Sequence, residues 1–287
     1  MQIFNLPDDS FPDHGAERII FQNYTAHPGA FKGRGILQRH AISLVISGEK
    51  TMHFAERTVH ARDDEFHFLS AGNCVVTMNL LGTTPFRSIL IFFDHKTLSD
   101  FYLKYETLTK NTRLSKNDAP EPYLSFKKDA FITNFIDSIS LFLRPSGNQS
   151  PGVQSSGKFS PEMRQLKFEE LMLYILEKYP SSLLSFREPG NRHPDDLLIR
   201  KAVETNITNN INVEELAFLC NMSLSTFKRR FIKLYGMPPT EWFVQQRMKL
   251  AKELLHHEKP SEVYYKVGYE SHSGFSAQPP ARIILYL

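Results

Sequence analysis

Residues Ser223–Leu255 read SLSTFKRRFIKLYGMPPTEWFVQQRMKLAKELL, and this stretch decides the fold of the last third of the chain. Ser223 is a residue type that caps helix N-termini, and Gly236 is a favoured helix end. Between them the sequence predicts a helix over Leu224–Tyr235 with one apolar stripe, formed by Phe227, Phe231 and Leu234. We therefore expect one face of this helix to be buried.

A shorter helix is predicted just before it, over Asn212–Leu219, because Asn212 is a capping residue and apolar residues recur at helical spacing. Cys220-Asn221-Met222 separates the two helices, and asparagine is one of the few residues that tolerate a left-handed turn. Two short helices joined by a tight turn form a helix-turn-helix, which places its second helix in the DNA major groove.

The side of the second helix opposite its apolar stripe is polar and cationic and carries no acidic residue. It presents Ser225, Thr226, Arg229 and Lys233, with Lys228 and Arg230 on the flanks. On a helix inserted in a groove, cations neutralise phosphates and polar side chains read base edges. The alternative is that these residues form a solvated basic face on a core helix.

The same stretch resembles the signature of the AraC/XylS family of bacterial transcriptional regulators. The matching positions are Ser223, Phe227, Arg229, Phe231, Gly236, Pro239, Trp242, Arg247, Met248, Ala251, Leu254 and Leu255. Residues Ser261–Ser271 look like the start of that family's second helix-turn-helix. The resemblance implies two such units joined by a rigid helix, here Pro239–His256, that enter successive major grooves about 34 Å apart.

The resemblance also implies roles for individual residues. Trp242 is expected to anchor the core, and Arg247 to form a salt bridge within the domain. The residues expected to read bases are Ser225, Thr226, Lys228 and Arg229, and those expected to contact phosphates are Arg230 and Lys233. The implied function is a sequence-specific DNA-binding transcriptional activator, with double-stranded DNA and RNA polymerase as partners.

The end of the chain departs from the family pattern. The second recognition helix should continue beyond Phe275, but Pro279 and Pro280 would break it within about two turns. The candidate DNA-contacting residues left on it are His272, Ser273 and Ser276. We therefore expect an incomplete second unit that contributes little DNA affinity.

The first half of the chain consists of short apolar runs separated by turns, which predict strands over 41–46, 51–54, 58–61, 66–69, 74–78 and 88–93. The family commonly places a cupin-like sensor domain before the DNA-binding domain. The expected fold class is therefore α+β. It combines a cupin-like β-barrel in residues 1–180, a linker over 181–194 and an all-α DNA-binding domain over 195–287.

Two apolar helices, predicted over 126–143 and 160–179, complete the first domain. Leu166–Leu171 resembles the dimerisation helix of the type III secretion activators in this family, which are controlled by a protein partner. We expect a homodimer with one of the two helices as its seam, around Leu171 and Ile175 if it is the second. The alternative is that both helices pack on the barrel. The effector is either a small molecule inside the barrel or a regulatory protein on its surface.

Composition excludes several other classes of protein. The net charge of +3 is too small to indicate nucleic-acid binding by itself, and Cys74 and Cys220 form no metal or disulfide motif. The histidines of the first domain lack ligand spacing, so no metal is expected at His27, His40, His53, His60 or His67. No cofactor is expected either.

No catalytic constellation stands out in the sequence, so the chain is not expected to be an enzyme. No targeting or membrane-spanning segment is found, so we expect a cytoplasmic protein without a membrane partner. The alternative function is a cupin-like ligand- or protein-binding interaction protein whose DNA-binding part is non-functional.

Overall fold

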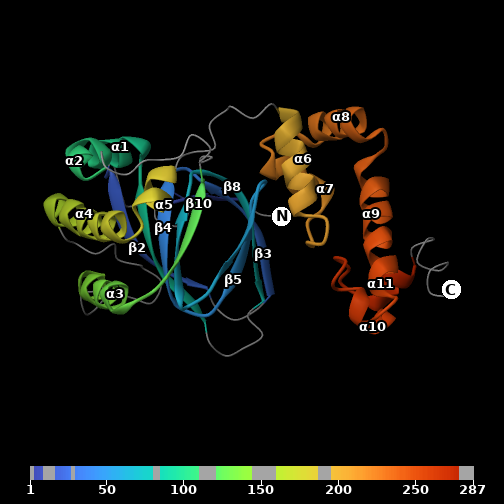
Figure 1. The fold of residues 1–287 in the computed structure, drawn as a ribbon, viewed down its shortest axis with the longest axis horizontal. Coiled ribbons are helices and arrows are strands. Elements are labelled where there is room, and N and C mark those ends of the chain that lie inside the picture. The colour runs from blue at the N-terminus through green and yellow to red at the C-terminus, as the bar shows by residue number, and fades with distance from the viewer. Residues whose placement is uncertain are drawn as a thin grey trace. The chain divides into compact units, whose positions relative to one another are not determined.

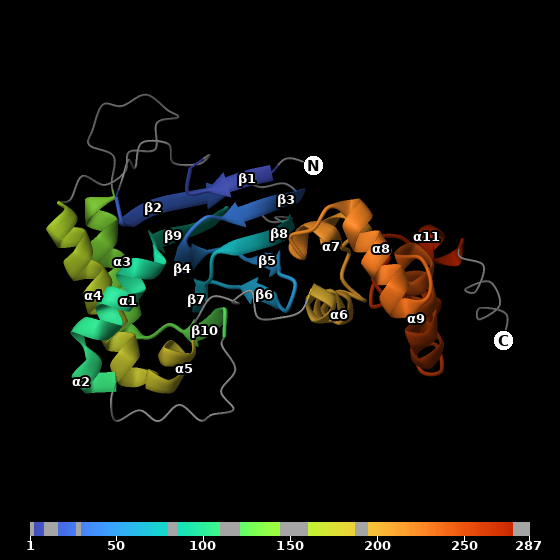
Figure 2. The same cartoon turned by 90° about the horizontal axis from the view of Figure 1, so that it is seen from above.

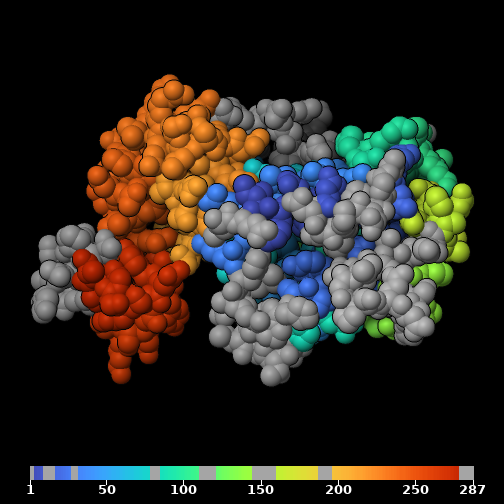
Figure 3. Space-filling model, turned by 180° about the vertical axis from the view of Figure 1, so that it is seen from behind, coloured from blue at the N-terminus to red at the C-terminus, as the bar shows by residue number. Residues whose placement is uncertain are grey.

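The computed structural model describes residues 3–8, 17–26, 30–79, 85–109, 121–143, 160–186 and 195–277 (Figure 1). The chain divides into two compact units. The first comprises Met1–Met52 and His60–Arg192, and the second comprises His53–Val59 and His193–Leu287. In the space-filling view the first unit is mainly blue to yellow-green and the helices of the second are orange and red (Figure 3).

Two five-stranded sheets form the body of the first unit. One has the order β1-β3-β8-β5-β6 and the other β10-β7-β4-β9-β2. The bounds are β1 Ile3–Leu6, β2 Ile19–Ala26, β3 Ala30–Leu37, β4 His40–Ser47, β5 Lys50–His53, β6 Thr58–Ala61, β7 Glu65–Leu69, β8 Gly72–Asn79, β9 Phe86–Phe93 and β10 Tyr123–Lys127. Among the described residues no strand pairing joins the two sheets, so the closed barrel expected from the sequence is not found. The six predicted strands are confirmed, whereas β1, β2, β3 and β10 were not predicted.

The outer face of the second sheet is apolar and covered by helices (Figure 2). These are α1 His95–Lys104, α3 Ala130–Phe142, α4 Pro161–Lys178 and α5 Pro180–Ser185, while the short α2 spans Glu106–Thr109. Alternate strand residues such as Ile42, Leu44 and Ile91 are fully buried in one core with side chains of α1, α3, α4 and α5. Because successive strand residues point to opposite faces, the intervening residues face the other sheet.

The covering helices differ from expectation in three respects. Residues 126 and 127 belong to β10, so the helix predicted over 126–143 begins only at Ala130. Leu171 and Ile175, expected at a dimer seam, are completely buried in the core of the unit and are not available to a second copy. Leu183 and Phe186, assigned to the linker, are also completely buried in that core. The apolar pattern of α4 therefore reflects packing on the sheet.

The second unit contains the predicted helix-turn-helix. Its helices are α6 Asp195–Thr205, α7 Val213–Leu219, α8 Leu224–Tyr235, α9 Pro239–Leu254, α10 Pro260–Val263 and α11 His272–Ser276. Asn212 and Glu215 form a reciprocal capping box on α7, and the Ser223 hydroxyl accepts the Thr226 N–H at the start of α8. Asn221 has a φ of 54°, as predicted for the left-handed turn, and Gly236, the predicted helix end, has a φ of 74°.

Helix α9 links the two helical pairs of this unit. Near its start Trp242 lies 5.8 Å from the Phe231 ring and 4.8 Å from the Tyr235 ring, measured between centroids, as expected of a core anchor. Farther along, Met248 and Ala251 pack in one buried cluster with three residues of the second pair, Val263, Val267 and Phe275. Since Phe275 is completely buried, the short α11 is fixed on its neighbours by a single aromatic anchor. Pro279 and Pro280 lie outside the described residues.

Arg247 of α9 connects both helical pairs through backbone carbonyls. Its Nε donates to the Ile207 oxygen at 2.8 Å, one Nη to the Asn209 oxygen at 2.9 Å and the other to the Gly268 oxygen at 3.0 Å. The salt bridge predicted for Arg247 is therefore not found among these contacts, because its three partners are neutral backbone carbonyls. Gly268 has a φ of +83°, and a Cβ there would lie 2.7 Å from the Thr208 oxygen, so only glycine fits this close approach.

Replacing Arg247 with lysine should lower the free energy of unfolding of the second unit by about 2 kcal/mol. One ammonium cannot reach all three carbonyls, and a buried acceptor left unsatisfied costs about 1–3 kcal/mol. Urea unfolding followed through the fluorescence of Trp242, the single tryptophan of the chain, measures the change. Arg229→Lys, at an exposed position of α8, is the control and should shift stability by less than about 0.5 kcal/mol. Equal stability of both variants would contradict the role assigned to Arg247.

Candidate functional site

Helix α8 exposes a cationic face. Ser225, Lys228, Arg229 and Lys233 are all exposed, and no residue of α8 is acidic. With about 3.6 residues per turn, Lys228 and Arg229 lie one turn after Ser225, one to each side of it. Phe227 and Phe231 are completely buried on the opposite side of the helix. Four of the six candidate DNA-contacting residues of α8 therefore share one exposed surface.

Thr226 and Arg230 lie toward the flank of this surface. Thr226 is half-buried, and its hydroxyl accepts a hydrogen bond of 2.9 Å from the Ser223 hydroxyl. Arg230 is also half-buried, and its Nη1 lies 3.7 Å from the Asp196 carboxylate of α6. The structure thus separates these two residues from the exposed four, and their roles in base reading and phosphate binding stay predictions.

The candidates of the second helical pair form a smaller, polar surface. His272 and Ser273 are exposed and Ser276 is half-buried on α11. The side chains bond to one another: Ser276 Oγ lies 3.4 Å from His272 Nδ1, and Ser273 Oγ lies 3.1 Å from Ser271 Oγ. No lysine or arginine lies on α11 (His272–Ser276).

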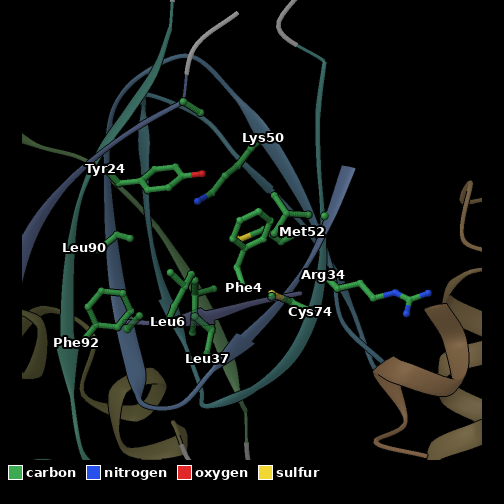
Figure 4. Close-up of a pocket in the computed structure, with 16 residues that line it drawn as sticks. Phe4, Leu6, Tyr24, Arg34, Leu37, Lys50, Met52, Cys74, Leu90 and Phe92 are labelled. Atoms are coloured by element: carbon green, nitrogen blue, oxygen red, sulfur yellow. The ribbon is translucent and has the colours of Figure 1, made fainter. Parts of the chain in front are cut away.

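The first unit contains a cavity of about 340 Å³ between its two sheets (Figure 4). Its walls are mostly apolar and include Leu37, Met52, Leu69, Leu90 and Phe92. Two cations line it, Lys50 and Arg34, but Arg34 points away from the cavity in Figure 4. Lys50 therefore supplies the positive charge of the interior.

Lys50 is only 9% exposed and contacts aromatic rings. Its Nζ lies 4.6 Å from the Phe86 ring centroid and 5.1 Å from that of Tyr24. In the described part of the chain no carboxylate pairs with this ammonium. Burial lowers the pKa of Lys50 to about 8 and raises the pKa of the neighbouring Cys74 thiol to about 11. The amine is thus a buried cation in contact with two ring faces.

Buried polar atoms lie on the inner face of the second sheet. In the strand register Ser88 stands beside Tyr24, and Ser43 stands between Leu90 and His67. The Ser43 and Ser88 hydroxyls and His67 Nε2 are buried without a hydrogen-bond partner among the described residues. Burial lowers the pKa of His67 to about 4, so this imidazole is neutral. Buried polar atoms of this kind are usually satisfied by water or a ligand.

Sequence reasoning did not find this cavity. Lys50 directly follows the turn residues Gly48 and Glu49 in the sequence, and the cavity walls come from strands whose pairing the sequence does not reveal. No group of three or more His, Cys, Asp or Glu side chains suited to a metal occurs in the described ranges, and His27 lies outside them. None of the described helices is long and apolar enough to cross a membrane.

Two family models match the chain. The model of the ExsA N-terminal regulatory domain matches residues 40–186, and a helix-turn-helix domain model matches residues 216–278. The chain is 26% identical to the virulence regulon transcriptional activator VirF of Yersinia enterocolitica over 238 residues, which cover 81% of this chain and 82% of VirF.

It is also 30% identical to the HTH-type transcriptional regulator ExsA of Pseudomonas aeruginosa over 120 residues, which cover 40% of this chain and 42% of ExsA. The structure of ToxT from Vibrio cholerae aligns with 94% of this chain and 99% of its own, with a TM-score of 0.38 and 13% identity.

The contribution of Lys50 to the stability of the first unit should rise with pH between about pH 8 and 10.5. The pKa of Lys50 is lowered from 10.5 to about 8 on folding, so the unfolded chain binds more protons across this window. Lys50→Met removes that titration, and the variant should be more stable at pH 7, where the wild type buries a charge. Urea unfolding followed by far-UV circular dichroism at pH 7 and 9.5 measures both effects. Lys96→Met, at an exposed lysine of α1, is the control and should keep the wild-type change in the free energy of unfolding between the two pH values. If Lys50→Met shows that same change, the lowered pKa assigned to Lys50 is wrong.

Proposed function

Because the chain belongs to the AraC family of DNA-binding transcriptional activators, in the branch with an ExsA-type N-terminal regulatory domain, we propose that α8 reads its target site. In this proposal the second unit, from about residue 195, inserts α8 into a major groove. Ser225, Lys228 and Arg229 read base edges, and Lys233 neutralises a phosphate. As an activator the chain would also contact RNA polymerase.

The observation that carries this proposal is the exposed, acid-free face of α8. A helix that merely covered a core would have no need to hold three exposed cations without a compensating carboxylate. The capping at Ser223 and the left-handed end at Gly236 fix the length of the helix, so that these cations are presented by a rigid element. By contrast, α11 offers His272, Ser273 and Ser276 without a lysine or arginine. We therefore propose that the first helix-turn-helix supplies most of the DNA affinity.

Two alanine variants separate base reading from phosphate binding. Arg229→Ala should cost about 1–3 kcal/mol at the best site and reduce discrimination between sites. Lys233→Ala should weaken binding to all sequences about equally and reduce the salt slope of log Kd by about one. Binding of the full-length chain to duplexes selected from a random pool, measured at several salt concentrations, gives both quantities. Lys96→Ala in the first unit is the control and should bind like wild type. If Arg229→Ala and Lys233→Ala also bind like wild type, α8 is not the reading helix.

For the regulatory domain we propose a small-molecule effector in the cavity between the sheets. Its apolar body would fill the space around Leu90 and Phe92, and its anionic group would pair with the Lys50 ammonium. A buried cation without a carboxylate partner favours an anion over a neutral ligand. The Tyr24 ring, which also lines the cavity, lies 5.1 Å from the Lys50 Nζ.

An apolar fluorescent anion, 8-anilinonaphthalene-1-sulfonate, tests this site in the full-length chain. Lys50→Met should weaken its binding by about tenfold or more, as expected for the loss of one buried ion pair of about 1.4 kcal/mol. Arg34→Met, at a cation that points away from the cavity, should bind the probe like wild type. Equal binding by wild type and Lys50→Met would contradict the cavity site and favour a protein effector on the surface.

The expected homodimer requires a surface other than Leu171 and Ile175. Exposed apolar side chains on the two helices are Leu166 of α4, 59% exposed, and Leu141 and Phe142 of α3, 64% and 40% exposed. We propose that a second copy of the chain covers this surface, and that dimerisation brings two α8 helices to one DNA site.

A further inference from the structure

We infer that Ile232 is a specificity-determining residue of α8 and reads the 5-methyl group of a thymine in the major groove. The inference rests on the proposed role of α8 as the DNA-reading helix. Ile232 is 45% exposed, although it is a large apolar side chain in the middle of a charged helix surface. Sequence reasoning passed over it because it selected the polar and cationic residues of that surface.

Ile232 lies on the centre line of the exposed face. It follows Ser225 by seven positions, and seven residues of an α-helix fall only about 20° short of two full turns. The two side chains therefore project in nearly the same direction, with Lys228 and Arg229 between them on either side. If Ser225 faces the floor of a groove, Ile232 faces it as well, two turns farther along.

The neighbours of Ile232 show that this position is not needed for the core. Phe227 and Phe231 already fill the buried side of α8 and are completely buried. The other exposed apolar residue of the helix, Leu224, borders a groove that it forms with Thr240 and Phe243 of α9. On the helix face Ile232 instead lies one turn after Lys228 and Arg229, one to each side of it, and both are exposed.

The chemistry of the major groove identifies the group that an isoleucine can recognise there. All four bases present hydrogen-bond donors or acceptors, and thymine alone also presents a methyl group. An isoleucine has no hydrogen-bonding atom in its side chain, so its contact with a base edge is favourable where that edge is apolar. The cations on both sides would hold the phosphates while Ile232 covers the methyl group.

Replacement of single thymines by deoxyuridine tests the inference, because it removes the methyl group and leaves the pairing and hydrogen-bonding edges intact. The experiment uses the full-length chain and a duplex selected from a random pool. At one thymine or two adjacent thymines the substitution should weaken wild-type binding about fourfold, which corresponds to about 0.8 kcal/mol for one buried methyl group. In Ile232→Ala the same substitution should change binding less than about 1.5-fold, as expected when the partner of the methyl group is absent.

Two matched variants separate this contact from general effects. Leu224→Ala removes the other exposed apolar side chain of α8 and should keep the wild-type penalty for deoxyuridine. Lys233→Ala should lose affinity for every duplex but keep the penalty as well. Because Ile232 is exposed, the alanine variant should unfold at the same urea concentration as wild type, which confirms that it is folded.

The inference is overturned if wild type and Ile232→Ala show the same deoxyuridine penalty at every thymine, or if no selected site has a thymine under α8. In that case, reduced binding by Arg229→Ala and Lys233→Ala would still support α8 as the reading helix. If those two variants also bind normally, the proposed function fails together with the inference.

Discussion

The geometry of the second unit depends on one guanidinium. Arg247 holds the backbone of residues 207–209, which precedes the first helix-turn-helix, and that of Gly268 in the second. A planar group with several fixed donors can bind three carbonyls at once, which a lysine cannot. The ring faces of Phe243 and Tyr269 lie 5.7 and 5.6 Å from its central carbon and keep the guanidinium in place. The orientation of both helical pairs along α9 is therefore fixed by charge-assisted bonds at one point.

In the first unit the fold depends on the second sheet, whose two faces are covered by different layers: helices on one side and the first sheet on the other. In the central strand segment 42–44, Ile42 and Leu44 face the helices and are apolar, whereas Ser43 points to the other side. The inner face combines apolar residues with Ser43, His67 and Ser88. A sheet that only had to bind two layers together would bury apolar residues on both faces. Lys50 lines the cavity on the opposite sheet, whereas Ser43, His67 and Ser88 carry buried polar atoms within the second sheet.

Local signals in the sequence predicted the helix-turn-helix well. Asn212, Asn221, Ser223 and Gly236 act through their own backbone and their nearest neighbours, so their meaning does not depend on distant parts of the chain. The six predicted strands were found for the same reason, since each is bounded by turn residues. The pairing of β2 with β9, and the helix α5 in the predicted linker, depend on contacts between distant segments and were missed.

The candidate sites show the same division. The exposed cations of α8 could be predicted because helical periodicity assigns each residue to a face. Leu171 and Ile175 were correctly recognised as an apolar stripe, but periodicity does not say whether a sheet or a second copy covers it. The cavity could not be predicted, because a lysine after a turn is normally exposed and only the tertiary fold buries Lys50.

The distribution of three side chains gives the protein a built-in set of reporters. Cys74 is buried in the first unit and Cys220 in the second, while Trp242 lies in the second alone. A buried thiol reacts with an alkylating reagent only when its surroundings open, so the labelling rate of each cysteine records the opening of its own unit. Mass spectrometry of the two cysteine-containing peptides would then follow both units in the intact chain, with no label introduced by mutation. The effect of an effector or of DNA on each half of the protein could be read from these two rates.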